Sequence, residues 1–329
     1  MDGTGHTRDH GGNLDAAMAR HGGARADWMD LSTGINPMPY PVPPILPDTW
    51  ASLPTRSDMT ALREAAANCY NTQAAITAFA GAQGAIQAIP FLHPPGQARV
   101  LGPTYNEHAA ALRMAGWQVN AVGTPDALAG ADLAVVVNPN NPDGRRHGPE
   151  ALRSLAERVG LLVVDESFVD PEPALSLAPT LPHNAIVLRS FGKFYGLAGV
   201  RLGFALSAPG TDARLSEMAG PWPVSGPAIR IACKALADLA WHTATCARLA
   251  ANAARLDAIA QGAGWQRVGG TPLFRTYATP DPARAQDRLA RARIWSRIFP
   301  YSDHWIRLGL PQDSEDNWDR LDAALRGAP

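Results

Sequence analysis

The chain has 329 residues, of which 46% are hydrophobic and 18% are charged, enough for about two domains of ~150 residues each. Its 29 basic and 30 acidic residues nearly balance, which gives no electrostatic reason to expect binding to nucleic acid or to an anionic membrane surface. The three cysteines are widely separated and lack metal-binding spacing, so we expect buried thiols and no metal site. Without a secretory signal or an apolar run of ~20 residues, a cytoplasmic protein with no membrane segment is expected.

The first ~48 residues are predicted to form an extended arm. A polar, glycine-rich start is followed by six prolines between residues 35 and 47. Proline fixes the backbone in an extended conformation and cannot donate a hydrogen bond inside a sheet. Beyond this arm, Asp58 is expected to cap a helix that runs to Tyr70.

From residue 58 onward, short apolar runs alternate with segments of helical periodicity. Strands are predicted at residues 77–80, 99–101, 117–122, 133–137, 161–164 and 185–189. Because these strands alternate with helices and several are apolar throughout, the pattern predicts an α/β fold with a mainly parallel sheet covered on both faces.

A turn-forming segment at residues 220–223 (GPWP) interrupts this pattern. After it, residues 227–261 are alanine-rich and are predicted to form one long helix, and the remainder predicts a few strands and helices. The expected organisation is therefore an N-terminal arm (1–48) associated with the small domain, a large domain (49–222) and a smaller α+β domain (223–329).

Lys193 is the most informative residue of the chain. Only two lysines are present, at positions 193 and 234, and Lys193 lies in a glycine-rich turn between two apolar runs. A buried ammonium group is costly to desolvate, so its pKa shifts or it reacts. Lysines in such positions form Schiff bases with carbonyl compounds.

Other polar residues follow the predicted strands in the same way. The loop at Gly81, Asn141 and Asp165 each come at the carboxyl end of a strand, as Lys193 does. Ligands of open parallel sheets bind at that edge. Taken singly, Asp165 is also explained as a helix cap or a buried ion-pair partner, and Asn141 as a turn residue. The combination predicts one site.

The same residues belong to motifs that occur in a fixed order along the chain. These are residues 140–144 (NNPDG), 165–168 (DESF), 190–193 (SFGK), 199–203 (GVRLG) and 306–308 (IRL). Over nearly its whole length the sequence resembles pyridoxal-phosphate (PLP) enzymes of fold type I. It is most similar to the histidinol-phosphate-aminotransferase branch of the class I and II aminotransferases. The resemblance implies a large domain with a mainly parallel sheet and a smaller α+β C-terminal domain.

The resemblance also implies roles for individual residues. Lys193 would form the Schiff base with PLP, and Asp165 would pair with the ring nitrogen and keep it protonated. Asn141 would bind the ring oxygen and Tyr105 would stack on the ring. The phosphate group is assigned to Ala82, Gln83, Gly84, Ser190 and Arg201.

Two positions depart from the pattern of this branch. Phe168 stands where a tyrosine usually binds the ring oxygen, so that hydrogen bond is lost. Leu53 stands where a tyrosine usually reaches the cofactor phosphate of a neighbouring subunit. Neither change removes the lysine, so catalytic activity is still expected.

Within this branch, further motifs are similar to those of the threonine-phosphate decarboxylases of cobalamin biosynthesis. They are residues 10–13 (HGGN), 31–37 (LSTGINP) and 189–199 (RSFGKFYGLAG), together with an arginine at 297 that precedes Arg307. The resemblance assigns His10, Asn36, Arg297 and Arg307 to a small phosphorylated amino-acid substrate, whose acidic groups suit the bidentate guanidinium. It implies decarboxylation of O-phospho-L-threonine to 1-aminopropan-2-yl phosphate by a homodimer.

Two alternatives remain open at this point. An aminotransferase acting on histidinol phosphate, or on a related phosphorylated amine or amino acid, would use the same lysine to move a proton from Cα. A regulator that uses this fold as an effector sensor would need a DNA-binding domain, and the ~50 proline-rich residues before the first βα unit leave no room for one.

Overall fold

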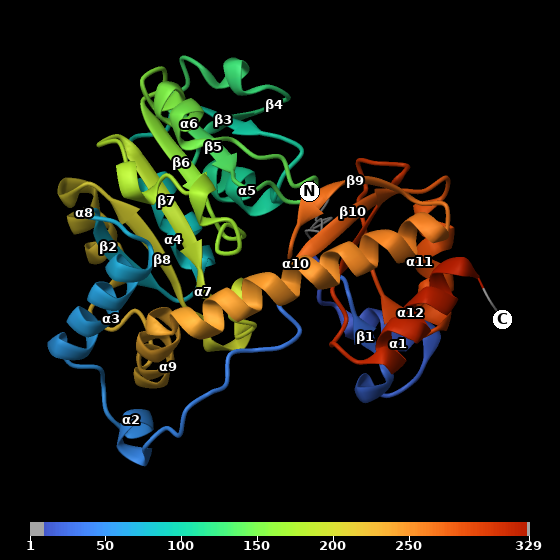
Figure 1. Cartoon of the computed structure of the whole chain (residues 1–329). Helices are drawn as coiled ribbons and strands as arrows, with labels where there is room; N and C mark the ends of the chain where they lie inside the picture. The colour runs from blue at the N-terminus through green and yellow to red at the C-terminus, as the bar shows by residue number, and fades with distance from the viewer. Residues whose placement is uncertain (1–9, 328–329) are drawn as a thin grey trace, which may run out of the picture. The chain divides into compact units, whose positions relative to one another are not determined.

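The computed structural model describes residues 10–327 of the chain (Figure 1). It divides into two compact units. The larger unit is Pro39–Ala247, and the smaller unit combines the segment that ends at Met38 with the segment that begins at Arg248. The sequence-based boundaries at 48 and 222 differ from this division, and they stay a prediction.

A seven-stranded sheet forms the centre of the larger unit, in the order β2-β8-β7-β6-β5-β3-β4. The strands are β2 (Ala75–Phe79), β3 (Gln97–Leu101), β4 (Gln118–Val122), β5 (Leu133–Val137), β6 (Leu161–Asp165), β7 (Ala185–Ser190) and β8 (Gly203–Ser207). Strands β4, β3, β5, β6 and β7 pair in parallel. Strand β8 is antiparallel to both β7 and β2. The predicted α/β architecture with a mainly parallel sheet is confirmed.

Apolar side chains cover both faces of the central strands. In β5 and β6 every residue is buried, as expected for parallel strands with helices on both sides. On one face, Val135 and Val163 pack with Ile86 of α4, Leu112 of α5 and Leu215 of α8. This packing makes the strands a rigid base for the groups at their ends.

The helices of the larger unit are α2 (Pro47–Ala51), α3 (Arg56–Cys69), α4 (Ala82–Ala88), α5 (Asn106–Met114), α6 (Pro149–Ala156), α7 (Phe191–Phe194), α8 (Pro209–Ala219) and α9 (Gly226–Ala237). The predicted cap of α3 was wrong by one turn. Thr55 is the N-cap, and Asp58 bonds back to its backbone N–H at 2.9 Å. This reciprocal arrangement is a capping box.

The single long helix predicted over residues 227–261 was also wrong. Two helices, α9 and α10 (Leu239–Gly262), meet at Asp238. The Asp238 carboxylate accepts a hydrogen bond from the backbone N–H of Trp241 at 2.9 Å. An aspartate can cap a new helix in this way, and alanine content alone does not reveal the break.

The smaller unit contains a four-stranded antiparallel sheet in the order β12-β13-β10-β9. Its strands are β9 (Gln266–Thr271), β10 (Phe274–Ala278), β12 (Arg297–Ile298) and β13 (Trp305–Gly309), and its helices include α1 (Leu14–His21), α11 (Pro282–Arg291) and α12 (Glu315–Arg326). The N-terminal strand β1 (Met29–Asp30) pairs in parallel with β11 (Ile294–Trp295). The two ends of the chain therefore build this unit together.

Candidate active site

Six chain segments of the larger unit bring polar residues to one edge of the seven-stranded sheet. Strands β3, β5, β6 and β7 are parallel, so the residues that follow them meet at the same edge. Strand β2 also ends there, and β8 begins there because it runs antiparallel. Between β3 and β5 the order of the strands reverses, since β4 lies on the far side of β3. Such a reversal is the usual location of a ligand crevice in open α/β sheets.

A pocket of about 120 Å³ lies at this edge. Its lining residues are Ala82, Gln83, Ile86, Tyr105, Val137, Asn141, Asp165, Ser167, Phe168, Ser190, Lys193 and Arg201. All the residues that the sequence assigned to the cofactor are in this set except Gly84, which lies in α4 beside them. The structure brings these residues together in one pocket, and the role of each residue stays a prediction.

Asp165 lies at the end of β6 and is buried at 3% exposure. One carboxylate oxygen lies 2.8 Å from His108 Nε2, and the other accepts hydrogen bonds from the Ser167 backbone N–H at 2.9 Å and hydroxyl at 2.5 Å. Burial by itself raises the pKa of this carboxyl group, but the bonds from His108 and Ser167 outweigh it and the net pKa is lowered. The side chain is therefore held as a carboxylate in fixed orientation.

Lys193 is half-buried in α7, the short helix that follows β7. Its Nζ lies 6.0 Å from the centre of the Phe168 ring, and both residues line the pocket. A primary amine and a buried carboxylate thus share one small pocket. An aldehyde that reached this pocket could condense with the amine while the carboxylate faced a cationic group.

Arg201 lies opposite the start of α4. Its backbone adopts the left-handed conformation, with φ at +54°, which is uncommon for a non-glycine residue and marks a constrained position. A Cβ added to Gly81 would lie 2.6 Å from the guanidinium, and Gly203 is in direct contact with the backbone of Ala82. Glycine at both positions lets a cationic group and a helix start approach each other, which suits a phosphate.

Tyr105 is held in place through its hydroxyl group. The hydroxyl donates to Gln83 Oε1 at 3.3 Å, and Gln83 Nε2 donates to the buried Glu107 at 3.2 Å. This chain of bonds links the loop after β3 to the start of α4. The aromatic ring is thereby fixed against the pocket.

Behind the pocket, three buried charged side chains form a cluster. Arg189 Nη2 lies 2.5 Å from Asp170, and Arg189 Nη1 lies 3.4 Å from Glu166. Tyr70 lies under the guanidinium at 4.0 Å. Glu166 directly follows Asp165, and Arg189 directly precedes Ser190. The cluster, Arg189–Glu166–Asp170, therefore ties together the two strand ends that carry the carboxylate and the lysine.

Arg297 and Arg307, which the sequence assigned to the substrate, lie directly opposite each other on β12 and β13. Directly opposed residues of antiparallel strands project to the same face, where like charges repel. Arg307 is buried at 5% exposure and donates to the Ser32 carbonyl at 2.6 Å. The Arg307 guanidinium lies 5.1 Å from the centre of the Phe274 ring, and that of Arg297 lies 5.4 Å from the centre of the Phe299 ring.

The other two residues assigned to the substrate also belong to the smaller unit. Asn36 is buried, and its Oδ1 accepts hydrogen bonds from the Met38 backbone at 3.1 Å and from Arg248 Nη2 at 3.2 Å. His10 is exposed at the start of the described residues. Two residues later, the Gly12 backbone N–H donates to the Ser32 hydroxyl at 2.7 Å. Ser32 thus accepts hydrogen bonds from two places: its hydroxyl from the segment that carries His10, and its carbonyl from the Arg307 side chain.

The sequence did not reveal two residues that contact Asp165. His108 and Ser167 together determine the state of its carboxylate. A possible signal was the position of Ser167 two residues after an aspartate, a spacing typical of side-chain-to-backbone turns. His108 gave no such signal, because a lone histidine on a helix is most often an ordinary core or surface residue.

The fold and the lysine-bearing pocket define an enzyme of the kind that binds an aldehyde coenzyme through an amine. The sequence matches the family described as aminotransferase class I and II over residues 46–325. Because this match covers most of the chain, the protein belongs to that family.

Two relatives are similar along almost their whole length. A threonine-phosphate decarboxylase from Sinorhizobium is 44% identical over 326 residues, covering 96% of this chain and 97% of its own. A threonine-phosphate decarboxylase from Pseudomonas aeruginosa is 43% identical, covering 97% of each chain. A histidinol-phosphate aminotransferase from Symbiobacterium thermophilum is 30% identical over 240 residues and covers 69% of this chain and 66% of its own.

Solved structures share the fold at low sequence identity. Histidinol-phosphate aminotransferase from Sinorhizobium meliloti, in complex with pyridoxal-5'-phosphate, has a TM-score of 0.84 at 22% identity and covers 98% of this chain and 95% of its own. L-threonine-O-3-phosphate decarboxylase from Porphyromonas gingivalis has a TM-score of 0.72 at 20% identity and covers 85% of this chain and 91% of its own. They show that the fold is that of PLP-dependent aminotransferases.

Within residues 10–327, no group of three or more His, Cys, Asp or Glu side chains is placed to hold a metal ion. In the same part of the chain, every helix is too short or too polar to cross a membrane.

Proposed function

We propose that the chain is a PLP-dependent decarboxylase that converts O-phospho-L-threonine to 1-aminopropan-2-yl phosphate and CO₂, a step of cobalamin biosynthesis. The observation that carries the proposal is the identity of 43–44% to two threonine-phosphate decarboxylases over nearly the whole chain. The aminotransferase relative is less identical and covers a smaller share of the chain.

The residues of the pocket fit PLP. Lys193 offers the amine for its aldehyde, and the orientation and lowered pKa of Asp165 suit a protonated ring nitrogen. Ser190 and Arg201, with the start of α4, would hold the phosphate group, and Tyr105 would stack on the ring. When bound, the coenzyme supplies an acceptor for the electron pair that the departing carboxylate leaves behind.

The protein residues direct which bond of the substrate breaks. In the smaller unit, Arg307 and Arg297 would bind the acidic groups of the substrate through bidentate contacts and fix its orientation. Asn36 is rigidly held and would contribute an amide contact, and His10 would contribute from the N-terminal segment. After CO₂ leaves, the Lys193 amine is the group in the pocket that can return a proton to Cα.

A homodimer in the cytoplasm completes the proposal. The larger unit exposes several large apolar side chains, including Leu46, Trp50, Leu53 and Trp222, each more than half exposed, and such surfaces are typical of protein interfaces. The three cysteines are free thiols, in keeping with a reducing compartment.

The test uses purified holoenzyme and O-phospho-L-threonine without any keto acid. Release of CO₂ with formation of 1-aminopropan-2-yl phosphate is the expected result. Turnover that strictly requires 2-oxoglutarate would instead establish the aminotransferase alternative.

The attachment of the coenzyme has its own test. Borohydride reduction followed by digestion and mass spectrometry should place the added mass on the peptide that contains Lys193. Because the chain has only one other lysine, Lys234→Ala is a matched control that should keep the modification, whereas Lys193→Ala should lose it. Modification of the Lys234 peptide alone would overturn the assignment.

A further inference from the structure

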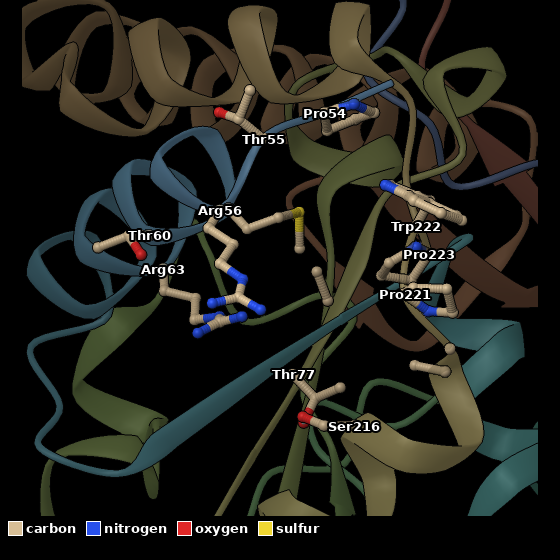
Figure 2. Close-up of a pocket in the computed structure, with 14 residues that line it drawn as sticks. Pro54, Thr55, Arg56, Thr60, Arg63, Thr77, Ser216, Pro221, Trp222 and Pro223 are labelled. Carbon is tan, nitrogen blue, oxygen red and sulfur yellow. The ribbon is translucent and has the colours of Figure 1, made fainter. Parts of the chain in front are cut away.

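Outside the coenzyme pocket, the larger unit has a hollow of about 590 Å³ between α3, the middle of β2 and the segment after α8 (Figure 2). Trp222 and Pro54 line it, and Leu53 directly precedes Pro54. Leu53 and Trp222 belong to the exposed apolar side chains that support the proposed homodimer, so the hollow is part of that proposed contact. The smaller unit, by contrast, joins residues assigned to the substrate through hydrogen bonds to one buried serine.

That serine is Ser32, which is 1% exposed. Its hydroxyl lies 2.7 Å from the Gly12 backbone nitrogen and 2.6 Å from Asp30 Oδ1. An N–H group can only donate and a carboxylate oxygen can only accept, so the hydroxyl accepts from Gly12 and donates to Asp30. The Ser32 carbonyl accepts from Arg307 Nη2 at 2.6 Å. One residue therefore holds both the segment that carries His10 and the Arg307 side chain.

The backbone around Ser32 is fixed by bonds within the smaller unit. Asp30 Oδ1 also accepts a hydrogen bond from the Ser32 backbone N–H at 2.9 Å, in a local turn that sets the direction of the carboxylate. Between these two residues, the Leu31 backbone N–H donates to the Trp295 carbonyl at 2.8 Å, and the Leu31 carbonyl accepts from Gly309 at 2.7 Å. Ser32 is thus anchored independently of the N-terminal segment that it holds.

The N-terminal segment comes close to Ser32 because two glycines follow His10. A Cβ added to Gly11 would clash with the Ser32 carbonyl oxygen. Gly12 has a φ of +88°, a left-handed conformation that glycine adopts without strain. Segments near a chain end are usually poorly ordered unless a contact holds them, and the bond between Gly12 and Ser32 is such a contact.

We propose that Ser32 is a positioning residue for substrate binding, whose hydroxyl holds His10 in a fixed place relative to Arg307. For the identity of the substrate, this proposal rests on the proposed function. Ordering a loose segment costs free energy at the moment of binding, and a segment that is already held avoids this cost. Loss of the hydroxyl should therefore weaken substrate binding through His10, whereas the bond from Arg307 uses the Ser32 backbone and remains.

Hydrogen exchange of the peptide that contains the Gly12 amide, measured by mass spectrometry on the holoenzyme, tests the bond without any substrate. Ser32→Ala should raise the exchange rate of this amide by about five- to tenfold, because its hydrogen bond is lost. The matched control is Ser296→Ala. Ser296 is also 1% exposed in the same unit, and its hydroxyl has no hydrogen-bond partner among residues 10–327. Equal exchange in wild type and Ser32→Ala would overturn the proposal.

A double-mutant cycle tests the effect on binding. His10→Ala and Ser32→Ala should each raise the KM for O-phospho-L-threonine by about three- to tenfold with kcat nearly unchanged. The double variant should bind no more weakly than His10→Ala alone, because both changes remove the same contribution. Gly11→Ala displaces the segment but keeps the Ser32 hydroxyl, so it should resemble Ser32→Ala, and Ser296→Ala should resemble wild type.

Additive effects of the two changes would contradict the proposal, since His10 and Ser32 would then act independently. So would an unchanged KM in either single variant, or a loss confined to kcat. A wild-type enzyme that releases no CO₂ from O-phospho-L-threonine would overturn the proposed function alone, because the exchange measurement still decides whether Ser32 holds the segment.

Discussion

The two units carry charged groups in opposite ways. In the larger unit, the charged groups near Lys193 are satisfied within the protein: Asp165 is bonded to His108 and Ser167, and Arg189 is bonded to Glu166 and Asp170. In the smaller unit, Arg297 and Arg307 face each other across two strands. The first arrangement fixes the side chains of the coenzyme pocket through buried bonds, and the second places two cationic side chains at one position of a small sheet, where we propose that an acidic substrate binds.

The largest expected effect comes from breaking the buried cluster of the larger unit. Arg189→Met leaves Glu166 and Asp170 buried without their cation, which should lower the free energy of unfolding by about 3–5 kcal/mol. Urea denaturation followed by tryptophan fluorescence measures it. The control is Arg255→Met, which removes an exposed pair with Glu315 and should change stability little. Equal midpoints for both variants would show that the cluster is not a stabilising element.

The corresponding change in the smaller unit should affect binding more than folding. Arg307→Met should raise the KM for O-phosphothreonine by about 10- to 100-fold, because charge-assisted bonds to the substrate are lost, with a smaller change in kcat. Arg297→Met should have a weaker effect, since Arg297 is only half-buried. Steady-state kinetics separates the two constants, and Arg267→Met on β9 is the control. A loss confined to kcat would contradict a binding role.

Replacing His108 tests how the larger unit controls the charge of Asp165. The pKa of Asp165 is lowered in the folded protein, so the carboxylate contributes stability above its ordinary pKa, and this contribution is lost as the pH falls through the lowered value. His108→Gln removes one cause of the lowering, so PLP affinity and stability should be lost at a higher pH than in wild type. At mildly acidic pH we expect about tenfold weaker PLP binding.

Absorbance titrations of PLP into the apoenzyme across the acid range measure this shift. His93→Gln replaces an exposed histidine of the same unit and should leave the profile unchanged. An identical acid limb in His108→Gln and wild type would show that Ser167 alone maintains the carboxylate.

The smallest effect is expected from a local interaction. Thr55→Ala removes the cap of α3 and should lower the free energy of unfolding by about 1 kcal/mol. The Ser57→Ala variant removes a hydroxyl that lies 2.9 Å from Thr55 Oγ1 but keeps both bonds between Thr55 and Asp58, so it should lie close to wild type. If both variants had the same stability in urea, the capping box at Thr55 would contribute nothing measurable.

Much of the larger unit could be predicted because its signals are local and repeated. Apolar runs of about five residues located the strands, and the residues that follow them, Asn141, Asp165 and Lys193, do line one pocket. The parts that could not be predicted depend on contacts between distant segments. The bond from His108 joins α5 to β6 across 57 positions, and the antiparallel direction of β8 is set by its neighbours in the sheet. The break at Asp238 was hidden because both flanking segments are alanine-rich.

The pairing of β1 with β11 has a consequence for how the chain is made. The larger unit is one continuous stretch, Pro39–Ala247, whereas the smaller unit needs segments from both ends. On the ribosome, Met29 emerges long before its partner Ile294. More than two hundred residues are translated between them, and these residues can begin to fold before β1 pairs with β11. Until then Trp28 and Leu31, which are buried in the finished protein, stay open to solvent and to chaperones.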